Sequence, residues 1–356
     1  MVRTASSGEV TPDGRDSDAL VDGPGEDGEE ERKLNWFDRF TDRIDRWQRR
    51  IRPVAVVFAV TKKYGDDRGG QLSGLLAYKG FFSLFPLLLA FVNVLGLVLA
   101  NNDELREDLI DSALSSVPVI GSEIEKGAGA VSGNVAVVIG SILVSLWAGL
   151  GLLDMLQESI NTVWNVPMTD RPPFLIRRLR ALPGAILIGA CAALSGSSSW
   201  LTEAGPPILG DIAEYLLPLL AGGLAFIGLH RILSSRRSTL GRLAPGAVLC
   251  AIGWTLLYRL GSWYVERIVT NSSDTYGVFV VVFGLLSWCL LLGTVFLYSN
   301  ELSVVIADRR WPRSMTGRNL SDVDQQSLAL LAEREVRVQG TDIDVRVPEN
   351  PKPPQP

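Results

Sequence analysis

Charged and amide side chains fall inside stretches of this sequence that are otherwise apolar, and they are candidates for a polar path. Lys79, Ser83, Pro86 and Asn93 lie in one such stretch. A second group lies in or beside two later stretches and consists of Asp154, Glu158, Asn161, Asn300 and Glu301. If the stretches cross a bilayer, a charge within them costs at least about 2.5–3.5 kcal/mol, so it usually faces protein or water. We therefore interpret both groups as the lining of a polar cavity used in transport.

Residue sets that support catalysis or metal binding are missing from the sequence. His230 is the single histidine, and the spacing of Cys191, Cys250 and Cys289 fits neither a zinc site nor a disulfide framework. No Walker loop or dinucleotide fingerprint is present, and the basic loops lack an aromatic platform for nucleic acid. We expect no catalytic residue, no metal, no cofactor and no nucleic-acid partner, so the protein is predicted not to be an enzyme.

Six apolar stretches are each long enough to cross a membrane as a helix. A hydrocarbon core of about 30 Å requires roughly 20 helical residues. The chain is 47% hydrophobic, with a mean hydropathy of +0.21, and its apolar residues occur in runs rather than in stripes. These features exclude an ordinary soluble protein. The stretches cover residues 72–100, 134–155, 179–200, 213–233, 244–265 and 276–306.

The loops between these stretches alternate between basic and nearly base-free. Lysine and arginine gather before the first stretch and after the second, fourth and sixth, whereas the other loops carry only Arg106, Lys126 and Arg267. Basic residues stay on the cytoplasmic side of a membrane. The sequence therefore predicts an all-α bundle of six transmembrane helices in the cell (plasma or inner) membrane, with both termini in the cytoplasm.

In that orientation, Lys79, Asp154 and Glu301 all fall in the cytoplasmic half of the bundle. Two arrangements are open: the lysine and the acids form ion pairs, or they line a cavity open to the cytoplasm. A third interpretation concerns Lys79 alone, because its long stem can carry the ammonium group to the inner interface. Pro86 removes a backbone hydrogen bond and predicts a kinked first span. A kinked polar helix suits a substrate path, although ordinary packing also tolerates one.

Both ends of the chain have compositions typical of disorder. Residues 1–31 are acidic with few apolar side chains, and residues 311–356 are polar and end in a proline-rich run. We predict disordered tails at 1–31 and 311–356, and a transmembrane domain at 69–310 with an external helical loop at 101–133. The first tail lacks the basic start and apolar run of a signal peptide, so the first span is expected to be a mature helix.

A cytoplasmic amphipathic helix is predicted within residues 32–68. Its apolar side chains recur at helical spacing, with arginines covering much of the remaining surface. Such a helix lies on an anionic membrane surface, or it packs the same face against the bundle; the two interpretations are compatible. The apolar face consists of Phe37, Phe40, Ile44, Trp47 and Ile51.

Residues 180–187 are similar to residues 242–249, since both contain an arginine followed by Pro-Gly-Ala. One interpretation is a parallel repeat of two spans, as some transporters have. The other is local: arginine marks the interface, and proline fits the first helical turn, where its missing N–H has no partner to lose.

Three motifs resemble the YihY/BrkB family of membrane proteins. The first two read LAYKGFFSLFPLLL at residues 76–89 and LQESINTVWNV at residues 156–166. The third consists of Tyr276 and Gly277, followed later by Asn300, Glu301 and Leu302. The likeness covers about residues 32–310, and Lys79 departs from it, because the family often has an uncharged residue there.

The resemblance implies a bacterial inner-membrane protein of six helices. Members are linked to envelope integrity and serum resistance, and some to lipid export. An older ribonuclease BN label is regarded as a misassignment, and the absence here of a set of acids, histidines or metal ligands that could face RNA argues against it independently.

Two main functions stay open at this point. The first is a transporter or lipid-handling protein of the cell envelope, with membrane lipids as partners and a lipid or small solute as substrate. The second is a non-catalytic envelope-integrity or scaffold protein, whose amphipathic segment and tails recruit partners. A ribonuclease is the least favoured.

Overall fold

The computed structural model describes residues 43, 45, 47–48, 50–98, 135–204, 207–271, 277–315 and 320–341. Within these ranges the long elements are helices, and no strand is present. The predicted tail at 1–31, the external loop at 101–133, and Phe37, Phe40 and Ile44 lie outside the described residues.

Six long helices form the body of the protein, and each contains a run long and apolar enough to cross a membrane. Their outward surfaces carry large apolar side chains, such as Ile186 and Phe279, because a helix in lipid is apolar all round. The predicted all-α bundle of six spans is therefore confirmed. The helices are α3 (Gly69–Val98), α6 (Val135–Val163), α7 (Phe174–Ala204), α8 (Pro207–Leu233), α9 (Leu240–Asn271) and α10 (Gly277–Ala307).

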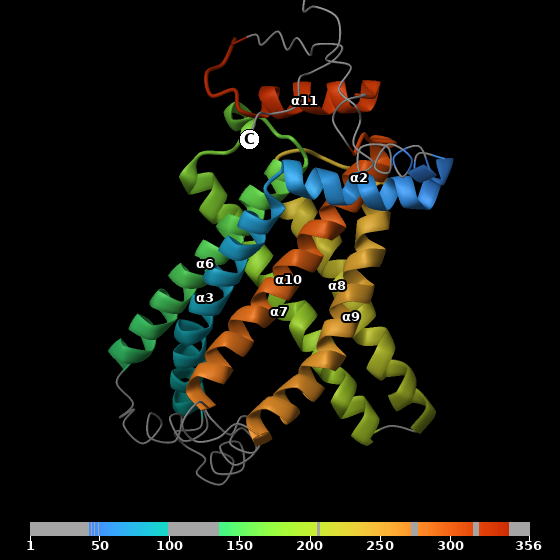
Figure 1. The fold of residues 1–356 in the computed structure, drawn as a ribbon. Helices are drawn as coiled ribbons and strands as arrows, with labels where there is room; N and C mark the ends of the chain where they lie inside the picture. Colours follow the sequence, from blue (N-terminus) through green and yellow to red (C-terminus); the bar gives the residue numbers. More distant parts are fainter. Residues whose placement is uncertain are drawn as a thin grey trace, which may run out of the picture.

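Helix α10 is central, since it packs against both α3 and α9, and the pairs α3–α6, α7–α8 and α8–α9 complete the bundle. Figure 1 shows the spans close together at one end and farther apart at the other. The largest buried side chains, Trp164, Phe226 and Ile160 among them, belong to one core cluster with Leu233, Leu243 and Leu297. The best-packed part of the bundle is thus held by α6, α8, α9 and α10.

Two shorter helices lie across the close-packed end of the bundle (Figure 1), and we call them the collar: α2 (Arg52–Asp66) and α11 (Asp322–Arg334). Helix α2 packs on α10 and buries Ala55, Ala59, Val60 and Lys63. It is separate from the helical residues before it, because the chain bends at Ile51, ahead of Pro53. The single amphipathic helix expected in 32–68 is therefore interrupted.

Helix α11 lies within residues 311–356, which were predicted to form a disordered tail, so the prediction is wrong for residues 322–334; residues 342–356 lie outside the described part of the chain. Its first turn is closed by a capping box, in which the Ser321 side chain accepts from the backbone N–H of Asp324 and the Asp324 side chain accepts from the backbone N–H of Ser321. Ion pairs to α2, described below, hold both of its ends. Helix α11 contributes no residue to the apolar core clusters of the described chain, and ion pairs of its charged groups attach it to the rest of the protein.

Pro183 and Pro245 lie beyond the first turns of α7 and α9. The local explanation for the likeness between residues 180–187 and 242–249 requires proline in the first turn, and neither site meets that requirement. Each of these prolines interrupts the backbone hydrogen bonding of its helix, as Pro86 does within α3.

Candidate functional site: a buried ion-pair network beside an apolar cavity

A buried lysine at the end of α2 joins three parts of the protein. The Lys63 Nζ lies 2.8 Å from Glu301 Oε2 on α10 and pairs with the Asp67 carboxylate just after α2. It also donates to the carbonyl oxygen of Val163, at the end of α6, at 2.7 Å. The three charged side chains are at most 4% exposed. Since a buried ion must be paired to be tolerated, this network fixes α2 against α6 and α10.

Asp67 also holds a second cation, which brings α11 into the network. The Arg334 Nη1 donates to Asp67 Oδ1 at 2.6 Å and to the carbonyl oxygen of Thr162 at 3.3 Å. Lys63 and Arg334 therefore balance Asp67 and Glu301, so the four buried groups carry no net charge. The collar is attached to the spans through this neutral set.

The first turn of α11 is attached to α2 through Asp324. Its carboxylate accepts from the Ser314 backbone N–H at 2.9 Å, from Lys62 Nζ at 3.1 Å and from Arg313 Nε at 3.1 Å. Burial raises the pKa of Asp324, but the N–H of Ser314, the Lys62 ammonium and the Ser321 hydroxyl outweigh it and lower the pKa to about 2. Arg313 also pairs with Asp66 at 2.8 Å.

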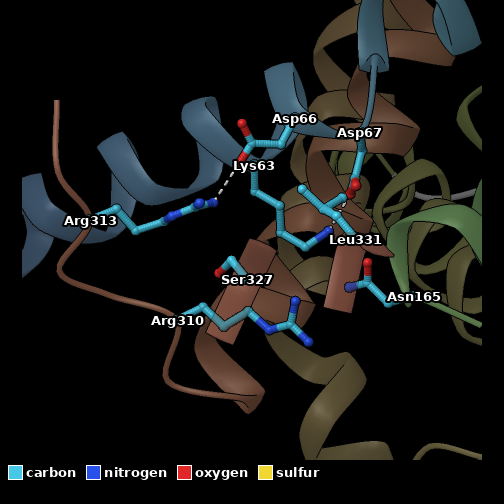
Figure 2. Close-up of a pocket in the computed structure, with 8 residues that line it drawn as sticks. All are labelled: Lys63, Asp66, Asp67, Asn165, Arg310, Arg313, Ser327 and Leu331. Carbon is cyan, nitrogen blue, oxygen red and sulfur yellow. Dashed lines mark hydrogen bonds and ion pairs between the residues drawn. The ribbon is translucent and has the colours of Figure 1, made fainter. Parts of the chain in front are cut away.

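Figure 2 shows this region, with Arg313 directed at Asp66 and with Lys63 beside Asp67. Ser327 and Leu331 of α11 and Asn165 close the small space between these charged groups. The cavity there measures about 10 Å³, which is about the room one water molecule needs. The collar network is therefore a closely packed contact between helices and has no room for a substrate.

Asn161 and Asn300 are buried at the same end of the bundle, as hydrogen-bonding partners of backbone and ring groups. Asn161 Oδ1 accepts from the Ser235 N–H at 2.9 Å. The Trp164 Nε1–H donates to Asn300 Oδ1 at 3.2 Å, and Asn300 Nδ2 donates to the carbonyl oxygen of Phe296 at 3.0 Å. Both amides therefore hold helices and connections together, and neither lines the large cavity described below.

The remaining predicted acids have partners on the connection after α6 and on α7. Arg177 lies 2.6 Å from Asp154 and 3.9 Å from Glu158, and Arg171 also pairs with Glu158. Helix α6 continues to Val163, so Glu158 lies inside it and not in a loop. These pairs are partly exposed, and they connect α6 to α7 and to the segment between the two helices.

Lys79 does not join any of these groups. Its side chain lies on the exposed surface of α3, whereas Glu301 pairs with Lys63, and Asp154 pairs with Arg177. Of the two arrangements left open, the ion pairs between Lys79 and the two acids therefore do not form. The exposed position agrees with the interpretation in which the ammonium group reaches the membrane interface. The Asn93 side chain lies outside the described part of the chain.

A large cavity lies within the bundle, and its lining is apolar rather than polar. It measures about 360 Å³ and is lined by all six spans. Among the predicted path residues whose side chains the structure describes, only Ser83 lines it, and its hydroxyl donates to the carbonyl oxygen of Gly80 in the same helix at 2.7 Å. The predicted polar cavity is thus replaced by an apolar one of a size typical of small-molecule sites, about 300–1,000 Å³.

Small side chains at helix contacts border this space, a role that their positions in the sequence do not indicate by themselves. Gly80, Ala221, Gly222 and Gly293 line the cavity, as do all three cysteines. A Cβ at Gly80 would lie 3.7 Å from the Sγ of Cys289, across the α3–α10 contact. The glycines and alanines within the apolar spans were the one sequence feature that could have indicated this cavity. In most membrane helices, however, such residues serve close packing between helices.

Two apolar residues before α2, Trp47 and Ile51, face outward. Trp47 is 56% exposed and Ile51 36%, whereas Asp45 and Gln48 are buried. Gln48 donates to the Arg313 carbonyl oxygen at 2.9 Å, and Asp45 accepts from the Met315 N–H at 2.9 Å. Of the two interpretations of the amphipathic face, packing against the bundle does not hold for Trp47 and Ile51.

Comparison with known proteins places the chain among membrane proteins. A family model described as "Virulence factor BrkB" matches residues 60–322. A UPF0761 membrane protein of Nitrosospira multiformis is 23% identical over 293 residues, which cover 78% of this chain and 67% of that protein. The inner membrane protein YhjD of Escherichia coli is 24% identical over 259 residues, covering 66% and 76%.

A ribonuclease-like protein, YfkH of Bacillus subtilis, is 24% identical over 270 residues, which cover 70% of this chain and 94% of YfkH. No solved structure matches the chain.

Proposed function

Since the chain belongs to the BrkB family of membrane proteins, we propose that it is a lipid-handling protein of the cell envelope that receives the acyl part of a lipid in the apolar cavity. The observation that carries this proposal is the lining of the cavity. Leu76, Leu152, Leu257 and Phe296 come from four different spans, and their side chains offer no hydrogen bond to a polar solute. An apolar chain is the ligand for which such a lining gains free energy.

The collar end faces the cytoplasm in this proposal, and the membrane is the inner membrane. The basic loops support this orientation, because they all lie at the end of the bundle that carries α2 and α11. The exposed Trp47 and Ile51 then lie at the level of the inner headgroups, where tryptophan is favoured.

The test is lipid movement between leaflets in liposomes that contain purified protein and a fluorescent phospholipid. Gly80→Leu extends a side chain from α3 toward Cys289 and fills part of the cavity. We expect it to slow lipid movement about tenfold, which corresponds to roughly 1.4 kcal/mol in the barrier.

Three control variants accompany this test. Gly80→Ala adds a Cβ at ordinary contact distance, and Gly74→Leu places the same leucine where nothing lies within 4 Å. Lys79→Leu removes an exposed charge outside the cavity. All three should move lipid at the wild-type rate. Equal rates for Gly80→Leu and Gly74→Leu would rule out the cavity as the lipid path.

The structure also offers support for a scaffold role, through the ordered collar that Asp67, Asp324 and Arg334 attach to the bundle. A scaffold would need the collar and the N-terminal segment, while a lipid path would need the cavity. If the cavity is the functional element, deleting residues 1–51 should therefore leave lipid movement unchanged. If the protein acts as a scaffold, the same deletion should abolish its function in the envelope.

We propose further that the protein has no ribonuclease activity. The name of YfkH describes that protein, and within the described part of this chain no three His, Cys, Asp or Glu residues are placed to hold a metal ion. Purified protein incubated with RNA, with and without added Mg²⁺ or Mn²⁺, should leave the RNA intact. Cleavage that copurifies with wild-type protein and follows its concentration would contradict the proposal.

A further inference from the structure

A second cavity, independent of the apolar one, lies at the collar end beside the connection between α8 and α9. It measures about 340 Å³. Its wall is formed by consecutive turns of one short segment, and Leu243 in the first turns of α9 completes it. The polar and charged residues that line it are His230, Arg231, Ser234, Arg236, Arg237 and Ser238.

The three arginines of this pocket lack a counter-ion within the described part of the chain. Arg231, Arg236 and Arg237 are exposed, and among the described residues none of them has an ion-pair partner. No acidic residue lines the pocket. Other arginines at this end differ, because Arg313 pairs with Asp66 and Arg334 with Asp67. The pocket therefore concentrates positive charge that no residue in the described part of the chain neutralises.

The floor of the pocket contains a buried polar group without a partner. His230 is 2% exposed, and within the described chain its Nε2 has no hydrogen-bond partner. The edge contact with the Trp164 ring, 4.5 Å between centroids, holds the imidazole in place. The Ser238 hydroxyl likewise has no partner among these residues. Buried polar groups are nearly always satisfied in folded proteins, so these two groups indicate a ligand with polar atoms.

The connection between α8 and α9 forms a tight turn, so its side chains can converge on the pocket. The Ser234 Oγ donates to the carbonyl oxygen of Arg236 at 2.9 Å and accepts from the Arg236 N–H at 3.2 Å. This turn directs the segment back toward the start of α9 at Leu240. A helix N-terminus carries partial positive charge, which adds to that of the arginines.

An adjoining cavity of about 260 Å³ extends the basic surface toward the collar. It shares Arg236 and adds Arg309, Arg310 and Ser327. Asp308 also lines it, but this acid already pairs with Arg310 at 3.1 Å and with Arg242. The charge presented by the two cavities together is therefore positive, and it lies at the basic end of a membrane-spanning bundle.

We propose that the pocket formed by His230, Arg231, Ser234, Arg236, Arg237 and Ser238 binds a phosphate group, carried by an anionic lipid headgroup or by a soluble phosphate ester. Guanidinium groups bind phosphate through paired N–H donors, and the serine hydroxyl and imidazole supply further donors at the floor. This site does not depend on the apolar cavity or on lipid movement.

The experiment has two arms, and both use the full-length protein. In the first, native mass spectrometry follows the lipids retained from nanodiscs made of equal phosphatidylglycerol and phosphatidylcholine. In the second, calorimetry measures binding of inorganic phosphate to delipidated protein at low ionic strength, where exposed charges are least screened. The test variant is Arg236→Gln with Arg237→Gln.

The matched control is Arg68→Gln with Arg337→Gln, which also removes two exposed charges outside the spans but changes no residue of the pocket. We expect the test variant to bind at least about tenfold more weakly and the control to match wild type, since each removed guanidinium takes charge-assisted hydrogen bonds with it. His230→Phe keeps a ring against Trp164 and should also weaken binding.

The arms separate the two sources of phosphate. Loss of phosphatidylglycerol selectivity in the test variant identifies a lipid headgroup, and loss of inorganic phosphate binding without lipid selectivity identifies a soluble ester. If the folded test variant and His230→Phe match wild type in both arms, the proposal is overturned.

Discussion

Replacing Lys63 by methionine should destabilise the protein far more than the same change at Lys62, its neighbour in α2. Lys63 is 4% exposed and is the ion-pair partner of Glu301 among the described residues, whereas Lys62 is 22% exposed. Lys62→Met leaves Asp324 with Arg313, the Ser314 N–H and Ser321. We therefore expect a loss of about 1 kcal/mol or less at Lys62.

At position 63 the loss should reach about 3–5 kcal/mol, the cost of breaking a buried ion pair. Arg334 still neutralises Asp67, but Glu301 and the Val163 carbonyl oxygen are left without their partner. Glu301→Gln should cost less, about 1–3 kcal/mol, because Lys63 keeps Asp67. The double variant restores neutrality, since only Asp67 and Arg334 remain charged.

The assay is unfolding of detergent-solubilised protein by increasing SDS, followed by far-UV circular dichroism. The expected order of stability is wild type, then Lys62→Met, then the double variant and Glu301→Gln, with Lys63→Met the least stable. The reasoning fails if Lys63→Met is no worse than Lys62→Met, or if adding Glu301→Gln to Lys63→Met gives no recovery.

Two further predictions concern the collar and the α9–α10 contact. The pKa of Asp324 is lowered from 3.8 to about 2, so ionised Asp324 contributes about 2 kcal/mol to the free energy of unfolding. This contribution is present above about pH 4 and is lost as the pH falls toward 2. The rate of hydrogen exchange in α11 should rise in that window, and Asp324→Asn should remove the change. Gly246→Ala should destabilise the protein by about 1–3 kcal/mol, because the added Cβ would overlap the Ser299 carbonyl oxygen. Gly241 has open space around it, so Gly241→Ala should leave the stability unchanged or raise it. Titration with SDS measures both effects.

The collar and the cavity divide the polar and apolar chemistry of the protein. Glu301, expected along a path through the membrane, is instead paired at one end of the bundle, where Lys63 and Arg334 balance it together with Asp67. The large cavity within the spans is lined mainly by apolar side chains. Charge pairing at one end of the bundle and the apolar cavity within it are therefore separate features of the fold.

Span number and family follow from the sequence, because hydrophobic length is a local property of the chain and the motifs are contiguous. The six stretches and the structure agree to within a few residues at most ends. The start of α11 could also have been predicted, because Ser321 and Asp324 have the spacing of a capping box. The polar composition of residues 311–356 favoured a disordered tail instead. Glu301 and Asn300 were recognised as unusual for the same local reason, their position inside an apolar run.

Only the tertiary structure decided the partners. Lys63 meets Glu301, and Asp67 meets Arg334, across separations of more than two hundred residues, and no periodicity in one segment encodes such a contact. The side of α3 on which Lys79 lies depends on how α6 and α10 pack against that helix. The apolar cavity arises where small side chains of several spans face each other, so its existence depends on the relative rotation of whole helices. The sequence determined which segments enter the membrane, and packing determined which of their faces meet.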